Sequence, residues 1–295
     1  GGDCVVELLD TFQVTKPHKQ MCLAFEMLGP SLLDLVIDYG YRGIPLALAK
    51  SITRHALRGL NFLHKKCNII HTDVKPENIL LTFKLQGESI SDWWAKHSQK
   101  GIKKGGKEPW KLQSGWSRGL PPSAVGAKLV DLGNSCFSDR HYSDNIQTIE
   151  YRSPEVIIGA GYSFAADVWS LACTVFELVT GEYLFDPQEG RDARNELCWS
   201  RDEDLLAHHQ ELLGVFPREF ALSGKQSDQL FDAQGALKRI SGLRFWGLKE
   251  VLVEKYGMAE AEAVQLSDFL VPMLSPDPAH RASAEERLGH AWLAA

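Results

Sequence analysis

The sequence predicts an α+β fold in which a short β-hairpin precedes a large, mainly helical body. Two short runs rich in β-branched and aromatic residues, 5–14 and 20–27, flank a turn signal around Pro17, a pattern typical of a hairpin. After residue 31, apolar residues recur mostly at helical spacing. The segment 165–180 is apolar almost all the way round, so we expect a helix buried at the centre of a sizeable domain.

The composition is that of an ordinary globular protein. Of the 295 residues, 44% are hydrophobic, and 32 Lys and Arg stand against 38 Asp and Glu, a net charge of −6. This acidic balance argues against nucleic-acid binding, and no apolar run approaches the roughly 20 residues of a membrane-spanning helix. Six cysteines lie far apart without a C-x-x-C pair, and no signal peptide is visible. We therefore expect a reduced, intracellular protein. We also expect a monomer.

The helical elements follow in order along the chain. Residues 45–66 place Leu48, Ile52 and Ala56 on one face, which predicts an amphipathic helix docked on a core. Gly181 is the expected end of the central helix, because glycine is favoured just past a helix C-terminus. Further helices are predicted at 202–213, 248–256, 259–274 and 284–289.

Residues 82–126 differ from the rest of the chain. The segment is rich in Lys, Gly and Ser and ends in Pro121-Pro122, so we interpret it as a poorly ordered surface insertion. Its tryptophans, Trp93, Trp94, Trp110 and Trp116, are the exception. They are expected to anchor the insertion to a neighbouring surface or to bind a partner.

The stretch 69–81 carries the strongest chemical signal. Two apolar runs flank a polar loop that holds Asp73, Lys75 and Asn78. Their oxygens suit a hard cation or a hydroxyl proton, and the lysine adds a positive charge. A second carboxylate, Asp131, ends the short apolar strand at 129–130 and is followed by Gly133 after one residue. Together these groups predict a site that handles a phosphoryl group.

The order of these motifs resembles the protein kinases. Residues 71–78 resemble the kinase catalytic loop, 131–133 the metal-binding motif, 153–155 the end of the activation segment and 167–170 the start of the central helix. The subfamily that the chain resembles is the SR-protein kinases, serine kinases of arginine–serine repeats in splicing factors. That resemblance is carried by the segments 71–73, 131–134, 146–148, 151–153, 180–185, 201–204, 211–214, 246–248 and 251–256, and by the insertion.

The resemblance implies a protein-kinase-like fold, ATP and Mg²⁺ as cofactors, and a role for each motif residue. Asp73 is the expected acceptor of the substrate hydroxyl's proton, and Lys75 the group that steadies the γ-phosphate. Asn78 and Asp131 are the expected metal ligands. Thr148 is expected to link the substrate-binding loop to Asp73.

The same resemblance implies the residues around the nucleotide. Phe25 is the expected gatekeeper behind the adenine, and Glu26 and Leu28 are expected to offer backbone hydrogen bonds. Leu80 is the expected floor of the adenine site, and Glu77 belongs to the loop that contacts the cofactor.

The resemblance also implies which residues support the catalytic loop and the activation segment. Glu155 is expected to pair with Arg281, and Asp167 to tie the catalytic loop to the central helix. Thr72 replaces the arginine that in many kinases pairs with a phosphorylated activation loop. We therefore hypothesise that the intact enzyme needs no such phosphate.

The resemblance divides the chain into a remnant of the small lobe with the hinge at 1–28, a helical lobe at 29–295 and a spacer-like insertion at 82–126. No Gly-rich loop or strand lysine is visible in this sequence. The hairpin should then leave apolar residues such as Leu8 and Leu23 uncovered, and we expect the isolated chain to be weakly active or inactive.

An acidic stretch follows the central helix, and the resemblance maps Glu182, Asp204 and Glu211 onto a docking groove for arginine-rich segments. The stretch 191–200 is longer than the resemblance implies and is expected to reshape or cover this groove. His208 and His209 lie on a predicted helix without other ligands nearby in sequence, so we expect surface histidines.

Two hypotheses result. The first is an ATP-dependent serine/threonine kinase of arginine/serine-rich proteins, with no membrane or direct nucleic-acid partner. The alternative is an impaired kinase or pseudokinase that binds arginine-rich peptides as a scaffold. The resemblance implies a distribution between cytoplasm and nucleus.

Overall fold

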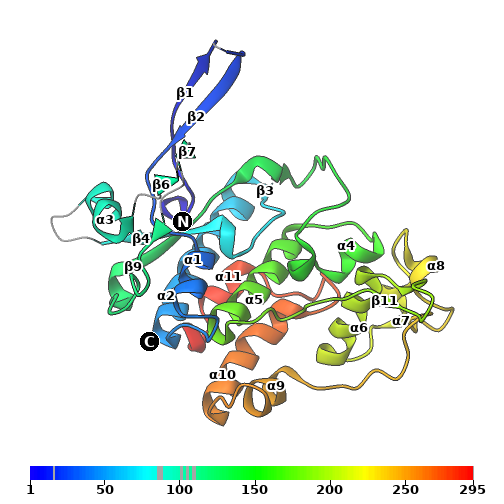
Figure 1. Ribbon diagram of the computed structural model, residues 1–295. Coiled ribbons are helices and arrows are strands. Elements are labelled where there is room, and N and C mark those ends of the chain that lie inside the picture. Colours follow the sequence, from blue (N-terminus) through cyan, green and yellow to red (C-terminus); the bar gives the residue numbers. More distant parts are fainter. Residues whose placement is uncertain (16, 85–88, 100–101, 104–105, 108–110, 295) are drawn as a thin grey trace.

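A β-hairpin stands on a helical body in the computed structural model of the chain (Figure 1), as the sequence predicts. The structure describes residues 1–295 except 16, 85–88, 100–101, 104–105, 108–110 and 295. Among the described residues, no helix has both the length and the apolar character needed to cross a bilayer.

The helices are α1 (Leu32–Asp38), α2 (Leu46–Phe62), α3 (Ile90–His97), α4 (Pro154–Ile158), α5 (Phe164–Thr180), α6 (Arg201–Leu213), α7 (Arg218–Ala221), α8 (Ser227–Leu230), α9 (Leu248–Glu254), α10 (Glu260–Leu270) and α11 (Ala284–Leu288). The strands form antiparallel pairs: β1 (Leu8–Val14) with β2 (Gln20–Phe25), β3 (Ile69–Ile70) with β10 (Cys136–Phe137), β4 (Ile79–Phe83) with β9 (Val125–Leu129), β5 (Ser98–Gln99) with β8 (Lys111–Leu112), β6 (Ile102–Lys103) with β7 (Gly106–Lys107), and β11 (Gly190–Arg191) with β12 (Leu197–Trp199).

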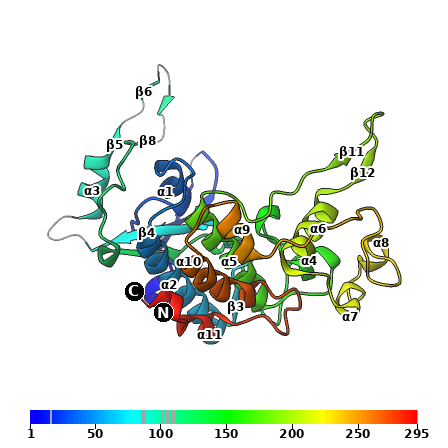
Figure 2. The same ribbon diagram turned by 90° about the horizontal axis from the view of Figure 1, so that it is seen from below.

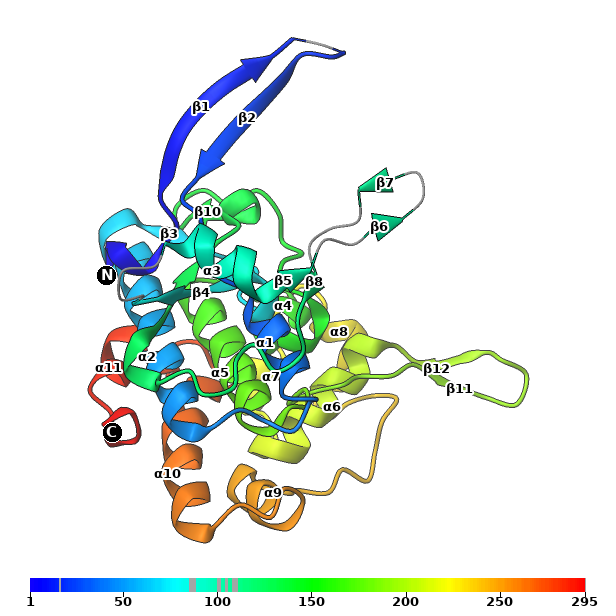
Figure 3. The ribbon, with the colours of Figure 1, turned by 60° about the vertical axis from the view of Figure 1, so that its left-hand side comes forward.

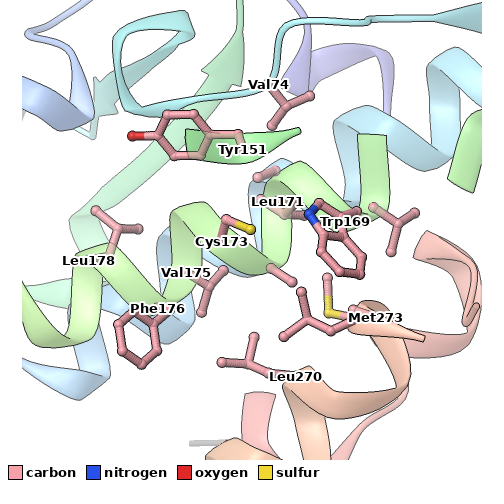
Figure 4. Close-up of a cluster of buried hydrophobic side chains, with 14 of the residues drawn as sticks. Val74, Tyr151, Trp169, Leu171, Cys173, Val175, Phe176, Leu178, Leu270 and Met273 are labelled. Carbon is pink, nitrogen blue, oxygen red and sulfur yellow. The ribbon is translucent and has the colours of Figure 1, made fainter. Parts of the chain in front are cut away.

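Helix α5 is the centre of the core. Its side chains Trp169, Cys173 and Phe176 are buried and pack among Leu270 and Met273 from the C-terminal helices (Figure 4). The predicted central helix is confirmed. It ends at Gly181, where φ is 85° and a Cβ atom would lie 2.3 Å from the backbone of Tyr41, so only glycine fits.

The other predicted helices are confirmed with small shifts of their ends. Helix α2 continues from Phe62 into a π-helical turn, Leu63–Cys67, which leads into β3. Helix α10 changes into a 3₁₀ turn at Val271–Leu274, because Pro272 cannot donate an α-helical hydrogen bond.

The hairpin β1–β2 projects from the body (Figure 3). Leu8 and Leu23 are about half exposed, at 48% and 55%, as the sequence predicts. The hairpin carries other exposed apolar side chains, among them Leu9 and Met21.

The insertion is better ordered in its described parts than the sequence predicts. Strands β4 and β9 pair through Phe83 and Val125, and α3 follows with a capping box at Ser89. Trp93 is 3% exposed and packs against Phe83 and Trp116. The expectation of a poorly ordered loop is therefore wrong for α3, while Trp110 lies outside the described residues.

His209 corrects another expectation, because it is buried rather than on the surface. Its ring is 0% exposed, and its centroid lies 4.6 Å from that of Trp169 and 4.5 Å from that of Phe185. Neither ring nitrogen has a hydrogen-bond partner among the described residues. Burial lowers the pKa of His209 well below its usual value, because the charged ring would lose its hydration.

We expect His209→Phe to make the protein less sensitive to acid. Below the ordinary histidine pKa of 6.5, this side chain binds a proton in the unfolded chain but stays neutral when it is buried in the folded protein. His209 therefore favours unfolding as the pH falls. Because of His209, the free energy of unfolding decreases by about 1.4 kcal/mol for each pH unit below the ordinary histidine pKa. Urea unfolding at about pH 7.5 and about pH 5.5 should show a smaller difference in the variant than in the wild type. The exposed His18→Gln control should behave like the wild type, and an unchanged difference in His209→Phe would contradict the interpretation.

Candidate active site

One buried carboxylate on helix α5 holds the loop between β3 and β4. Asp167 of α5 is 1% exposed and accepts hydrogen bonds of 2.8 Å from the backbone N–H groups of His71 and Thr72. His64 Nε2 lies 2.8 Å from the same carboxylate. Thr72 has a φ of 71°, a backbone conformation that a β-branched residue rarely adopts. The predicted link between Asp167 and the loop is confirmed, and it holds the backbone in this conformation.

Asp73 lies at the end of a small polar network. Lys75 Nζ lies 2.8 Å from Asp73 Oδ2, and Thr148 Oγ1 donates to Asp73 Oδ1 at 2.8 Å. Lys75 Nζ also donates to Thr148 Oγ1 at 2.9 Å, and Asn78 Nδ2 to the Asp73 carbonyl at 2.9 Å. The predicted link between Thr148 and Asp73 is confirmed.

This network sets the protonation of Asp73. Burial by itself would raise the pKa of the carboxyl group, but the hydrogen bonds from Lys75 and Thr148 outweigh it and lower the pKa below its usual value. Asp73 is therefore a carboxylate at neutral pH and is free to accept a proton.

Asp131 is brought to the catalytic loop by the pairing of β4 with β9. The preceding residue, Val130, donates its N–H to the Asn78 carbonyl at 3.0 Å and accepts from His71 Nε2 at 2.8 Å. Asp131 itself has a φ of 59°, and its carboxylate is exposed. Two loops that are distant in sequence thus meet beside one cleft.

That cleft has a volume of about 510 Å³. Its lining includes Asp73 and Thr148, and also Gly133 and Asn134, which follow Asp131. Thr72 Oγ1 donates to the Asn134 carbonyl at 2.9 Å and joins the two loops directly. No sequence pattern predicts this contact, because a lone threonine has many local uses.

Asn78 and Asp131 fit the chemistry of a Mg²⁺ site. Asn78 uses its amide nitrogen within the loop, its amide oxygen has no hydrogen-bond partner among the described residues, and Asp131 offers an exposed carboxylate. Hard oxygen donors of this kind are what Mg²⁺ prefers. The described residues contain no group of three or more His, Cys, Asp or Glu arranged to hold a metal ion.

The segment after β2 supplies free backbone groups where a nucleotide is expected. In the described part of the chain, neither the carbonyl of Glu26 nor the N–H of Leu28 has a hydrogen-bond partner. Leu28 already accepts, through its carbonyl, a 2.8 Å hydrogen bond from Trp94 Nε1. The sequence signal for this contact was the group of tryptophans in a lysine-rich segment, but it did not indicate their target.

The remaining predicted nucleotide residues lie on three different elements and differ in exposure. Phe25 ends β2 and is 49% exposed. Leu80 lies in β4 and bridges to Ser31. Glu77 is exposed in the 3₁₀ turn Pro76–Asn78.

The activation segment is anchored along α5. Gln147 donates to the Ala166 carbonyl and to Ser170 Oγ, both at 2.9 Å, and Ser153 N–H donates back to Gln147 Oε1 at 3.0 Å. Tyr151 is held at its carbonyl by Ser170 Oγ at 2.8 Å. The segment therefore follows the helix closely.

The end of the activation segment is fixed by a buried ion pair. Glu155 and Arg281, both with fully buried side chains, form two hydrogen bonds of 2.7 and 2.8 Å. Two parallel hydrogen bonds fix the orientation of both groups. The predicted pair is confirmed.

A second cavity, of about 1080 Å³, lies at the C-terminal end of α5. We call it the acidic groove, and it is lined by Glu177, Glu182, Tyr183, Asp186 and Glu211 among others. The structure thus brings two of the three predicted docking residues into one cavity.

The third predicted docking residue, Asp204, is not part of the groove lining. Asp204 lies 3.6 Å from His208, which does line the groove, and accepts a 2.8 Å hydrogen bond from the N–H of Gln188. The longer stretch at 191–200 forms the arm β11–β12, which projects from the body (Figure 2) and contributes no residue to the lining. The expectation that it covers the groove is therefore wrong.

Comparison with known proteins agrees with this geometry. The family of protein kinase domains matches residues 2–293. The serine/threonine-protein kinase SRPK of Physarum polycephalum is 41% identical, with 99% of this chain and 71% of that protein covered. Protein kinase dsk1 of Schizosaccharomyces pombe is 33% identical, covering 99% and 69%, and human SRSF protein kinase 3 is 31% identical, covering 99% and 75%. The chain therefore belongs to the protein kinase family, and within it to the SR-protein kinases, which are serine/threonine kinases.

Proposed function

We propose that the protein transfers the γ-phosphoryl group of ATP to serine hydroxyls in arginine/serine-rich proteins such as splicing factors. The observation that carries this proposal is the Asp73 carboxylate, which is held ionised between Lys75 and Thr148 and lines a cleft together with the residues that follow Asp131. The protein kinase family uses ATP, typically with Mg²⁺.

Each residue has a distinct task in this reaction. Asp73 accepts the proton of the serine hydroxyl as the serine oxygen bonds to the γ-phosphorus, while the bond from that phosphorus to the β–γ bridging oxygen breaks and ADP leaves with its electron pair. Lys75 offers a positive charge to the migrating phosphoryl group, and Thr148 keeps the carboxylate oriented. Asn78 and Asp131 are the residues that would hold Mg²⁺, which supplies charge neutralisation to the phosphates when bound.

The acidic groove supports the choice of substrate. Glu177, Glu182, Asp186 and Glu211 lie in one cavity with Lys255 and Arg244, and Lys255 pairs with Glu182 at 2.9 Å. Four carboxylates against two cations still leave an excess of negative charge. Single exposed ion pairs contribute only about 0–1 kcal/mol, but several carboxylates facing one peptide favour a strongly basic segment and speed its association. Substrates with arginine-rich segments fit this charge pattern.

The scaffold alternative is not favoured. A protein that only binds basic peptides needs the groove, whereas this chain also keeps Asp73, Lys75, Asn78 and Asp131 together. Activity in both cytoplasm and nucleus is part of the proposal and rests on the resemblance to SR-protein kinases.

Asp73→Asn should lower kcat on an arginine–serine peptide by about 10²- to 10⁴-fold, because the amide cannot take the hydroxyl proton. ATP binding should be retained, since Asp73 is not proposed to hold the nucleotide. Radiolabelled phosphate transfer and nucleotide titration measure the two effects. Asp139→Asn, an exposed change in the same segment as Asp131, is the control, and full activity of Asp73→Asn would contradict the mechanism.

Glu211→Gln should raise KM about 5-fold for a substrate with a long arginine-rich segment, since it removes one groove carboxylate. KM for a short serine peptide without that segment should not change. Glu219→Gln removes an exposed carboxylate that does not line the groove, so it is the matched control. An equal rise in KM for both substrates would argue against docking in the groove.

Phosphatase treatment of the full-length protein should leave its activity intact. Thr72 joins the catalytic loop to the Asn134 carbonyl through its own hydroxyl, so no phosphate is needed to link the two loops. The measurement is peptide phosphorylation before and after treatment. Loss of activity that returns on rephosphorylation would show that a phosphate orders the segment after all.

A further inference from the structure

A buried tyrosine–glutamate pair lies between the acidic groove and the active site. Tyr151 and Glu177 are each 4% exposed, and the Tyr151 hydroxyl donates to Glu177 Oε2 at 2.6 Å. Tyr151 belongs to the 3₁₀ turn Ile149–Tyr151, and Glu177 to α5. Neither residue touches the reacting groups in the proposed chemistry.

Each partner faces a different site. Glu177 lines the acidic groove together with Glu182 and Glu211. Tyr151 donates its backbone N–H to the Thr148 carbonyl at 3.0 Å, and the Thr148 hydroxyl donates to Asp73. Three consecutive hydrogen bonds therefore join the groove to the catalytic carboxylate.

The groove also touches Tyr151 through a second contact. The ring of Tyr183 lines the groove, is 46% exposed and meets the ring of Tyr151 edge-on, with 6.1 Å between the centroids. The carbonyl of Tyr151 is fixed to α5 by Ser170. Two groove-lining residues, Tyr183 and Glu177, thus both contact Tyr151 in the turn that follows Thr148.

The charge of Glu177 is sensitive to what fills the groove. Burial, together with the carboxylates of Glu77 and Glu150, raises the pKa of Glu177 to about 7, although the hydrogen bond from Tyr151 acts in the opposite direction. A cationic side chain in the groove favours the ionised form. An ionised acceptor makes the hydrogen bond from the Tyr151 hydroxyl roughly twice as strong as a neutral one does.

We propose that Glu177 and Tyr151 are positioning residues that couple a basic segment bound in the acidic groove to the placement of Thr148 at Asp73. The coupling rests on the proposed function, because it needs an arginine-rich segment in the groove. Docking then increases the rate of phosphoryl transfer as well as the affinity for the substrate.

The kinetic test compares two substrates in the full-length protein. One is a serine–arginine peptide with an arginine-rich docking segment, and the other is the same peptide without it. In the wild type we expect the docking segment to lower KM and to raise kcat about 5-fold. In Tyr151→Phe, which keeps every groove carboxylate, we expect the lower KM to remain and the rise in kcat to be lost. In Glu177→Gln, which also removes a groove carboxylate, we expect the rise in kcat to be lost and the gain in KM to shrink.

A second measurement does not depend on activity. Amide hydrogen exchange of residues 148–153 should slow about 5-fold when an oligo-arginine peptide without serine binds the wild type. The same peptide should change the exchange little in Glu177→Gln and Tyr151→Phe. Tyr39→Phe and Glu262→Gln make the same chemical changes outside the groove and the turn, and they should behave like the wild type.

The outcomes separate this coupling from the proposed function. The coupling is wrong if the docking segment lowers KM in the wild type but changes neither kcat nor exchange. It is also wrong if both variants keep the gain in kcat, or lose rate equally on both substrates, as a purely structural role would predict. The proposed function itself fails if the docking segment does not lower KM in the wild type or no serine is phosphorylated.

Discussion

The active site depends on the buried carboxylate of Asp167. It accepts the backbone N–H groups of two consecutive residues, His71 and Thr72, and so fixes the loop that presents Asp73. A buried carboxylate is costly unless it is fully hydrogen-bonded, and here the loop and His64 supply the donors. Because α5 is packed on all sides, the loop has a rigid support.

Helix α5 extends the same support to the substrate side. Along its length it holds Gln147 through Ala166 and Ser170, and it holds Tyr151 through Ser170 and Glu177. Its C-terminal end borders the acidic groove. One apolar helix thus fixes the catalytic loop, the activation segment and the docking surface relative to one another, which is why buried polar residues on it matter to function.

The insertion is attached to the helical body by hydrogen bonds and buried side chains. Trp94 reaches the Leu28 carbonyl, and Asp38 of α1 accepts hydrogen bonds from the backbone of Gly115 and Ser117. The insertion therefore meets the chain at the segment that follows β2. Its tryptophans act mainly as anchors within the described residues, since Trp93 and Trp116 are buried.

The sequence by itself determined the helical body, the central helix and the catalytic residues, because helical periodicity is local and the motifs lie within short stretches such as 71–78. Tertiary structure alone decided the rest. His209 looks like a surface residue in sequence, and only the packing of Trp169 and Phe185 around it shows that it is buried. The partners of Trp94, Thr72 and Glu177 lie many positions away or across packed elements, and no local pattern encodes such distances.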